Sequence, residues 1–283
     1  MTRLRPVMRY HGGKHKLAPW IVSQLPAHRI YVEPYGGAAS VLMLKPRSYA
    51  EVYNDLDGDV VNVFRVLRNP DQAAELRRLL ELTPFSRDEF HATRVDAVAD
   101  VSDPIERARR MVFRSFSGFG SAASNNTYMT GFRSNSNRAG RPPAMDWRNY
   151  PAFVDRFTNR LRGVVIENRE ALDVMRQHDG PATLFYVDPP YAHETRNLTN
   201  QYAYKYEMTD DEHREMAAVL DQLRGMVILS GYRCNLYDRI FPTWPRVDRM
   251  AFADGAAPRV ESLWFSPNVT HTQMRLHEGE VSA

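Results

Sequence analysis

The feature that most limits how this 283-residue chain can fold is an alternation of strand and helix patterns that breaks off and later resumes. An apolar strand is expected at 29–34, followed by a glycine turn, a helix start at 40–44 and a second strand at 51–55. A helix follows, because apolar residues recur on one helical face at Val60, Val63, Phe64 and Leu67. Alternation of this kind is typical of a mainly parallel sheet.

The alternation stops near residue 70 and resumes at 149. Beyond that point, strands are expected at 164–168, 183–188 and 226–232, and 247–252 with 260–265 forms an antiparallel hairpin. Residues 83–148 show two helix patterns and a long segment rich in Gly, Ser, Asn and Arg, but no core strand. We therefore predict an α/β domain built from residues 1–69 and 149–283, interrupted by a mostly helical insertion at residues 70–148.

Positive charge is concentrated in this insertion. Residues 104–148 hold eight arginines against Glu106 and Asp146, a net charge of +6 in a chain whose total is +3. Arginine suits contacts with phosphate and with guanine edges, so the distribution favours a nucleic-acid partner. A genome rich in GC, which favours arginine codons, explains the total arginine content equally well.

The arginines of the insertion divide into two groups by position. One group has helical spacing and can contact a DNA backbone; the other lies in the flexible segment and can reach into a groove. Solvated surface charges remain the alternative for both. The first group is Arg107, Arg110 and Arg114, and the second is Arg133, Arg138 and Arg141.

The most specific motif is Asp188-Pro189-Pro190-Tyr191, directly after a strongly apolar strand. Ligands of parallel sheets bind at the carboxyl ends of the strands. A carboxylate and a rigid backbone carbonyl can accept both hydrogens of an aromatic amine and direct its lone pair, while a tyrosine ring can stack on a base. The tetrad therefore suits methylation of an exocyclic amine, although Asp-Pro and Pro-Pro also occur in ordinary turns.

A second motif, Glu33-Pro34-Tyr35-Gly36-Gly37, follows the first strand, and Asp55 ends the second strand, 19 residues after Gly36. Glycines let the backbone approach a ligand, and a carboxylate at that distance is typical of a ribose contact. The full GxGxxG pattern is missing, which disfavours a nicotinamide cofactor. A third motif, Tyr10 to Lys14, lacks the spacing of a phosphate-binding loop and is better interpreted as flanking a cofactor, with Lys14 facing its carboxylate.

Other chemistry has less support. His11 and His15 lack the glutamate of a zinc-protease helix, and Ser230 lacks the hydrolase elbow. Cys234 is the single cysteine, which excludes an internal disulfide and fits a reducing compartment. No segment is apolar and long enough to span a bilayer or to act as a secretion signal, so we expect a cytoplasmic protein without a membrane partner.

These motifs, in this order, resemble the Dam-like adenine DNA methyltransferases of the alpha motif order, and the resemblance extends to Glu-x-Leu-Trp-Phe-x-Pro-Asn at 261–268. It implies a Rossmann-like, seven-stranded fold that uses S-adenosylmethionine, with residues 70–148 recognising the DNA target. It also implies which residues hold each ligand. The cofactor residues would be Tyr10, Lys14, Glu33, Pro34, Tyr35, Gly36, Gly37, Asp55, Asn168 and Asp188, and the adenine residues Asp188, Pro189, Pro190 and Tyr191.

Two features depart from the family pattern: Asn168 stands where similar enzymes often place an acidic residue, and the insertion does not clearly reproduce the family's GATC-reading hairpin.

We expect double-stranded DNA as substrate, no metal, and a bacterial or phage source; a monomer is compatible with the sequence. Amino-methylation of cytosine in DNA or of a base in RNA remains an alternative, as does a DNA-binding relative without activity. Restriction protection, phage counter-defence and gene regulation all stay open as biological roles.

Overall fold

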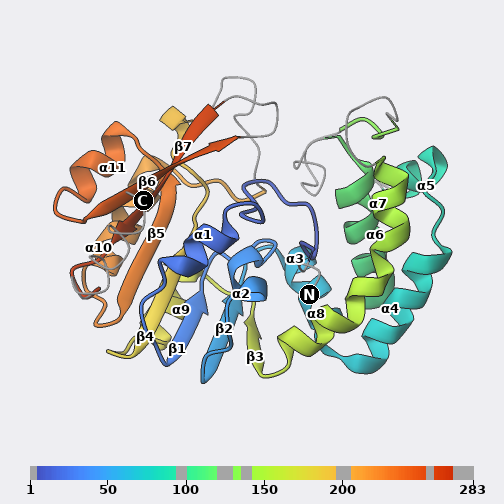
Figure 1. The fold of residues 1–283 in the computed structure, drawn as a ribbon, viewed down its shortest axis with the longest axis horizontal. Coiled ribbons are helices and arrows are strands. Elements are labelled where there is room, and N and C mark those ends of the chain that lie inside the picture. The colour runs from blue at the N-terminus through green and yellow to red at the C-terminus, as the bar shows by residue number, and fades with distance from the viewer. Residues whose placement is uncertain are drawn as a thin grey trace, which may run out of the picture.

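The structure is a computed structural model, and it describes residues 5–93, 101–119, 130–134, 142–195, 205–252 and 258–269. Its centre is a seven-stranded sheet with the strand order β3-β2-β1-β4-β5-β7-β6 (Figure 1). The first five strands of this order are parallel, and β7 is antiparallel to both β5 and β6. The strands are β1 Ile30–Glu33, β2 Ala50–Asn54, β3 Val164–Glu167, β4 Thr183–Val187, β5 Met226–Tyr232, β6 Arg246–Phe252 and β7 Pro258–Phe265.

This sheet confirms the predicted Rossmann-like methyltransferase fold, including the hairpin at one edge. Strand β1 lies between β2 and β4, with Glu33 paired to Tyr53 and Val32 to Phe185. The carboxyl ends of these three parallel strands therefore lie at one edge of the sheet. The residues that follow them in the sequence are brought together there.

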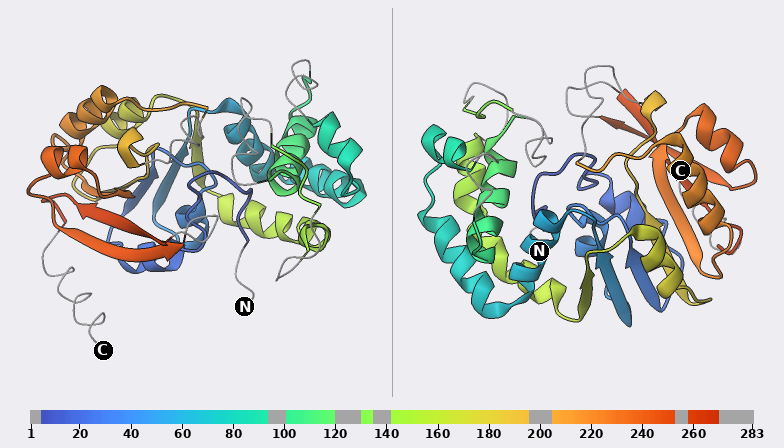
Figure 2. Two further views of the ribbon diagram at one scale, coloured as in Figure 1. Left: turned by 90° about the horizontal axis from the view of Figure 1, so that it is seen from above. Right: turned by 180° about the vertical axis from the view of Figure 1, so that it is seen from behind.

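Side chains that alternate along each strand divide the interior into two cores. Tyr31, Tyr53 and Leu184 point to one face, while Val32 and Phe185 point to the other. The second face is covered by α9 Ala171–Gln177, α10 Asp210–Leu220 and α11 Asn235–Ile240 (Figure 2). Helix α10 begins with a capping box formed by Thr209 and Glu212.

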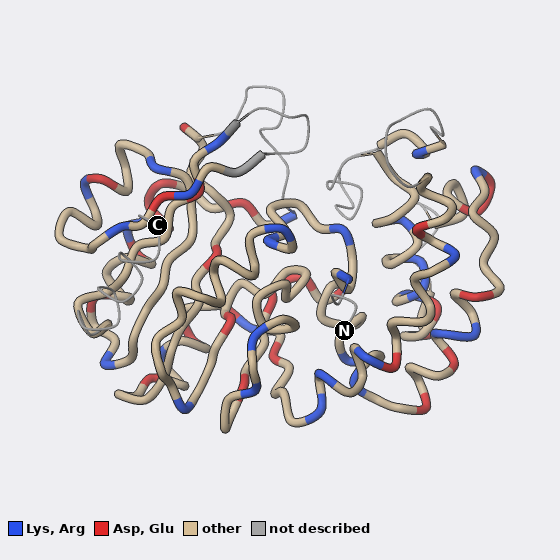
Figure 3. Tube along the Cα trace, viewed as in Figure 1, with Lys and Arg blue, Asp and Glu red and all other residues tan. Residues whose placement is uncertain are grey.

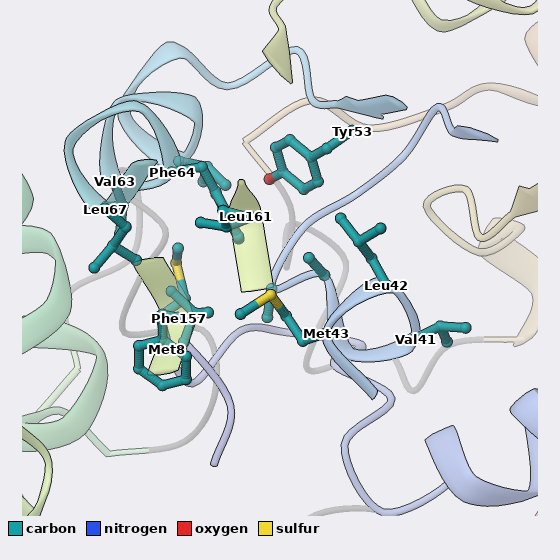
Figure 4. Packing of buried hydrophobic residues seen from close by; sticks show 14 of the residues in the cluster. Met8, Val41, Leu42, Met43, Tyr53, Val63, Phe64, Leu67, Phe157 and Leu161 are labelled. Carbon is teal, nitrogen blue, oxygen red and sulfur yellow. The ribbon is translucent and has the colours of Figure 1, made fainter. Parts of the chain in front are cut away.

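The core on the first face includes residues from helices that continue into the insertion. They are α1 Ala18–Ser23, α2 Ser40–Leu44, α3 Gly58–Arg68, α4 Pro70–Leu82, α5 Arg87–Ala92, α6 Pro104–Ser117, α7 Pro143–Asn149 and α8 Val154–Leu161. Figure 4 shows Phe64 and Leu67 of α3 in the same packed cluster as Phe157 and Leu161 of α8. Helices α3 and α8 lie outside the predicted insertion. Nevertheless, α3 packs on α4 and α6 of the insertion, and α8 packs on α4.

The insertion therefore shares one continuous hydrophobic core with the sheet. The predicted limits of the insertion, residues 70 and 148, divide DNA recognition from catalysis, and this division of roles stays a prediction. Among the described residues of 83–148, strand-type pairing is limited to a single bridge between Gly118 and Phe132. After the insertion, the chain forms a 3₁₀ turn at Pro151–Phe153 that leads into α8. Across the described ranges, no helix has both the length and the apolar character needed to cross a membrane.

Candidate active site

A cavity of about 370 Å³ opens at the carboxyl ends of β1, β2 and β4. Its volume is in the range of pockets that hold drug-sized ligands. Three separate sequence motifs line it, which confirms that the fold brings them together. From the predicted cofactor and adenine residues, the lining includes Tyr10, Lys14, Glu33, Pro34, Tyr35, Gly36, Gly37, Asp55, Asp188 and Pro190.

The glycine turn after β1 is packed too tightly for larger residues. A Cβ atom on Gly36 would lie 2.1 Å from the ring of Tyr53, and Gly37 has a positive φ of 47° with the Tyr10 ring close by. Gly37 N–H donates to Asp55 Oδ2 over 2.8 Å, and the Tyr53 hydroxyl donates to the Gly37 carbonyl over 2.7 Å. The end of β2 thus holds the turn that follows β1.

Asp55 braces this region through both of its oxygens. Oδ2 accepts from Gly37 and Oδ1 accepts from the Asp57 N–H over 2.8 Å. Burial raises the pKa of Asp55 to about 6, although the two backbone N–H groups and Lys205 oppose the rise. The structure therefore shows Asp55 as a support of the cavity wall, and its predicted ribose contact stays a prediction.

Glu33 presents an oxygen that the protein itself does not satisfy. Its Oε1 accepts from the Tyr31 hydroxyl over 2.9 Å and from the Leu42 N–H over 3.0 Å. Its Oε2 is buried, and no partner for it exists among the described residues. Burial raises the pKa of Glu33 to about 8, and Asp188 adds to the rise. A buried acceptor left open in a cavity wall fits a ligand that carries a donor or a positive charge.

Acidic side chains outnumber basic ones around the cavity. The basic residues are Lys14, Arg169 and Arg176, and the acidic residues are Glu33, Asp55, Glu170, Asp173, Asp188, Glu207, Glu212 and Glu215. An excess of carboxylates favours a cationic ligand. Several of these residues were missed in the sequence, although Arg169 to Asp173 follow the end of β3 and the strand-end rule would have found them.

Lys14 lies between two carboxylates of the protein. Its Nζ is 2.9 Å from Asp188 Oδ1 and 3.7 Å from Glu261 Oε1, and it donates to the Gly12 carbonyl over 2.7 Å. The lysine was expected to face a carboxylate of the cofactor. The structure instead pairs it with the first residue of the tetrad and with Glu261, a residue of the C-terminal motif to which the sequence assigned no role.

The tetrad follows β4, as predicted, and places Asp188 against the cavity. Burial raises the pKa of Asp188 to about 6; Lys14 opposes this rise and Glu261 adds to it. Tyr191 is only 6% exposed and its hydroxyl bonds Glu261 and Asp188. Its ring lies edge-on to Tyr232 at 4.7 Å, and Lys14 Nζ lies 4.7 Å from its centroid. The ring is therefore not open for base stacking in this conformation.

Asn168 lies outside the cavity lining. Its amide donates to the carbonyls of Asp55 and Leu56 over 2.8 and 3.0 Å, so it braces the turn after β2. The structure gives Asn168 this supporting contact, and its predicted contact with the cofactor stays a prediction. Because β3 ends beside β2, the Asn168 amide lies next to the backbone that follows β2.

The arginines predicted on one helix do lie on α6, but they are not an exposed row. Arg114 is 7% exposed and donates to the Thr93 carbonyl over 3.1 Å, which corrects its expected position on the surface. Arg107 pairs with Asp59 at 2.5 Å and Arg110 with Glu106 at 2.6 Å. Figure 3 shows the same mixing of basic and acidic positions along the helices of the insertion.

The arginines of the Gly/Ser/Asn-rich segment are only partly within the described chain. Arg133 is half-buried, and its backbone N–H donates to Ser117 at the end of α6 over 2.7 Å. Arg138 and Arg141 lie outside the described residues. All the DNA contacts predicted from the sequence therefore stay predictions.

The profile of one protein family matches most of this chain. The D12 class N6 adenine-specific DNA methyltransferases match residues 10–250. The chain belongs to this family. It is thus an adenine-specific DNA methyltransferase, with DNA as its substrate, which sets aside cytosine and RNA bases as the target. The family also implies a methyl donor.

Curated relatives agree with this assignment. The Type II methyltransferase M1.LlaDCHI of Lactococcus lactis subsp. cremoris is 25% identical over 84% of this chain and 84% of its own length. The DNA adenine methylase of Salmonella typhimurium is 24% identical over 82% of each chain. That of Serratia marcescens is 24% identical over 83% of this chain and 86% of its own length.

Proposed function

We propose that the methyl donor is S-adenosylmethionine and that it binds in the cavity at the ends of β1, β2 and β4. When bound there, it supplies a methyl group on a positively charged sulfonium. The excess of carboxylates in the lining and the open acceptor of Glu33 suit such a cation. Glu33, Tyr35, Asp55 and the glycine turn would hold it.

The observation that carries the proposal is the position of Asp188. It begins the tetrad, and it faces the same cavity that the glycine turn and Asp55 line. The Asp188 carboxylate and the Pro189 carbonyl would accept the two hydrogens of the adenine amine, which keeps its lone pair directed into the cavity. Because that amine is inaccessible within a duplex, the adenine would have to leave the base stack of double-stranded DNA.

The test is methyl transfer from labelled S-adenosylmethionine to a duplex library, followed by digestion to nucleosides and mass spectrometry. We expect N6-methyladenine, and single-molecule sequencing of the product would give the target sequence. A methylated cytosine, or no transfer by an enzyme that binds S-adenosylmethionine and duplex DNA, would overturn the proposal. Calorimetric titration with S-adenosylmethionine measures the binding step separately.

We further propose that the insertion contacts DNA through arginines. Arg107 and Arg110 would contact phosphates, where they would exchange their present carboxylate partners for DNA, while Arg133, Arg138 and Arg141 would contact base edges. Arg110→Ala should then weaken binding to all duplexes and reduce the salt slope by about one unit. Arg133→Ala should cost roughly 1–3 kcal/mol at the cognate site alone.

The buried arginine provides the matched control. Because Arg114 donates to a backbone carbonyl inside the insertion, Arg114→Ala should lower the melting temperature and leave the salt slope of the folded protein unchanged. Binding of cognate and random duplexes across a salt series measures all three variants. An unchanged slope for Arg110→Ala with unchanged specificity for Arg133→Ala would leave these arginines as surface charges.

A further inference from the structure

A buried group of three charges, which we call the acceptor cluster, lies behind the cavity: Lys14, Asp188 and Glu261. They come from the N-terminal turn, the end of β4 and strand β7 respectively. The Lys14 side chain is 6% exposed, that of Glu261 4% and that of Asp188 16%. One cation is thus shared by two carboxylates, and Asp188 is the member that reaches the cavity lining along with Lys14.

Glu261 contacts the two described side chains that bond to Asp188, namely Lys14 and Tyr191. Its Oε1 lies 3.7 Å from Lys14 Nζ and accepts from the Tyr191 hydroxyl. Ser230 of β5 donates to the same oxygen over 3.1 Å, which fixes the carboxylate from its other side. Glu261 therefore orders the two groups that in turn hold Asp188.

The antiparallel edge of the sheet explains how this residue reaches the site. Strand β7 pairs with β5 in a register that sets Glu261 opposite Tyr232, at the carboxyl end of β5. An antiparallel strand runs back along that edge, so its early residues lie where parallel strands end. The C-terminal motif thus delivers a carboxylate to the tetrad from 70 positions away in the sequence.

The contacts of Asp188 fall on one of its oxygens. Lys14 lies 2.9 Å from Oδ1, and the Tyr191 hydroxyl donates to Oδ1 over 3.3 Å. Within the part of the chain that the structure describes, no hydrogen bond to Oδ2 is observed. Lys14, together with a Tyr191 hydroxyl shared between Asp188 and Glu261, fixes the rotation of the carboxylate and leaves Oδ2 to accept from a ligand.

We propose that Glu261 is a positioning residue for methyl transfer: through Lys14 and Tyr191 it orients Asp188 so that Oδ2 is presented to the target amine. This inference rests on the proposed role of Asp188. Glu261 itself touches neither adenine nor donor. A buried glutamate that only satisfied Ser230 and Tyr191 would leave kcat unchanged in a variant that still folds, and this difference can be measured.

The test compares Glu261→Gln with Asp248→Asn. Gln keeps an oxygen for Ser230 and Tyr191 but removes the charge near Lys14. Asp248 is the matched control, because it is a carboxylate on the neighbouring strand of the same hairpin and accepts from Ser262 over 2.8 Å. We expect Glu261→Gln to lower kcat about ten- to a hundredfold, with KM for both substrates within a few-fold of normal, and Asp248→Asn to leave kcat unchanged.

The pH profile separates positioning from simple structural support. Groups that face Asp188 are Lys14, Glu261, Tyr191, Tyr186, Glu33 and Tyr237. Because Glu261 raises the pKa of Asp188 and Tyr191 lowers it, the acid limb of kcat/KM should move to lower pH in Glu261→Gln and to higher pH in Tyr191→Phe. Tyr191→Phe also gives a reading if Glu261→Gln does not fold.

The outcomes are distinguishable from failure of the proposed function. If the wild type transfers methyl groups and Asp188→Asn does not, the function stands. If a folded Glu261→Gln then has the same kcat and the same acid limb as Asp248→Asn, the positioning role is refuted. If Glu261→Gln is unfolded, a Tyr191→Phe limb identical to that of the wild type refutes it equally.

Discussion

Two buried groups of charges lie at opposite ends of the sheet, and they are built differently. The acceptor cluster, at the carboxyl ends, has two carboxylates around Lys14. The second group, which we call the anchor cluster, is Lys45, Glu51 and Arg160, where β2 begins. Here one carboxylate is shared by two cations, with Lys45 at 2.6 Å and Arg160 at 2.6 Å.

The pKa values follow this difference in balance. At Glu51, burial alone would raise the pKa, but the hydrogen bonds and charges of Arg160 and Lys45 outweigh it and hold the pKa below its ordinary value. At Asp188, burial prevails and raises the pKa to about 6. Both oxygens of Glu51 are thus bonded within the protein, whereas the acceptor cluster has unused capacity for donors and faces a cavity. We therefore expect charge balance to distinguish a structural group from a functional one.

The largest effect is expected from breaking the anchor cluster. Glu51→Gln leaves two buried cations without a carboxylate, which should lower the free energy of unfolding by about 3–5 kcal/mol. Activity of the folded protein at low temperature should change little, because Glu51 is remote from the cavity lining. Denaturant unfolding and initial rates measure the two effects. Loss of activity without loss of stability would contradict the assignment of this cluster.

The wild-type cluster also predicts a pH dependence of stability. A carboxylate whose folded pKa is lowered stabilises the protein above its unfolded pKa, and this stabilisation is lost as the pH falls through the folded value. Glu51→Gln should therefore be most destabilising at neutral pH, and its difference from wild type should shrink in acid. A difference that is constant with pH would mean that the charge of Glu51 contributes nothing.

Asp188→Asn should greatly reduce activity and hardly change stability, the opposite of what we expect for Glu51→Gln. Asparagine keeps the shape but replaces one acceptor oxygen by a donor, so kcat should fall about a hundredfold or more, roughly 3 kcal/mol in the barrier. Because the ionised form is disfavoured by burial, the melting temperature at pH 8 should equal or exceed that of the wild type. Affinity for S-adenosylmethionine should stay within a few-fold. A stability loss as large as that of Glu51→Gln would remove the contrast between the clusters.

A smaller effect is expected from lowering the pH of the wild-type reaction. Asp188 accepts most strongly from the amine when it is ionised, and its pKa in the free enzyme is about 6. Below that value, kcat/KM should fall about tenfold per pH unit, and above it the rate should level off. Initial rates at subsaturating DNA between pH 5 and 8 measure this limb. A flat profile would show that Asp188 is not the group that titrates.

The sequence was sufficient for the sheet because its strands end in recognisable turns. Residues 29–34 and 183–188 are largely apolar runs that lead into turns containing Gly or Pro. Local patterns of this kind identify the strands, their order along the chain and the edge of the sheet where a cavity forms. The Rossmann-like fold and the convergence of Tyr10, Asp55 and Asp188 on one cavity were therefore predictable. Family motifs added the antiparallel hairpin's place at the edge.

What the sequence could not show was the partner of each side chain. Lys14 was expected to face a ligand and pairs with Asp188, while Arg114 was expected on the surface and is buried. Both depend on residues distant in the sequence: Glu261 reaches the site only through the register of β7, and α5 covers Arg114 through the packing of the insertion. Helical spacing gives a face, but tertiary packing decides which face is covered.

The smallest effect is expected at Cys234, the only cysteine in the sequence, which is buried in the second core. Burial raises the pKa of its thiol to about 11, so at pH 8 it is a neutral, buried group and not a nucleophile. Its sulfur accepts from the Tyr237 N–H at the start of α11, and a serine hydroxyl can make the same cap.

Transfer of a methyl group from a sulfonium to an amine is a direct displacement that calls for neither a thiolate nor a metal-activated water. Cys234→Ser should therefore retain wild-type kcat and KM, and saturating chelator should leave both unchanged. Loss of activity in folded Cys234→Ser, or restoration of a chelated enzyme by zinc or magnesium, would require a different mechanism from the displacement directed by Asp188.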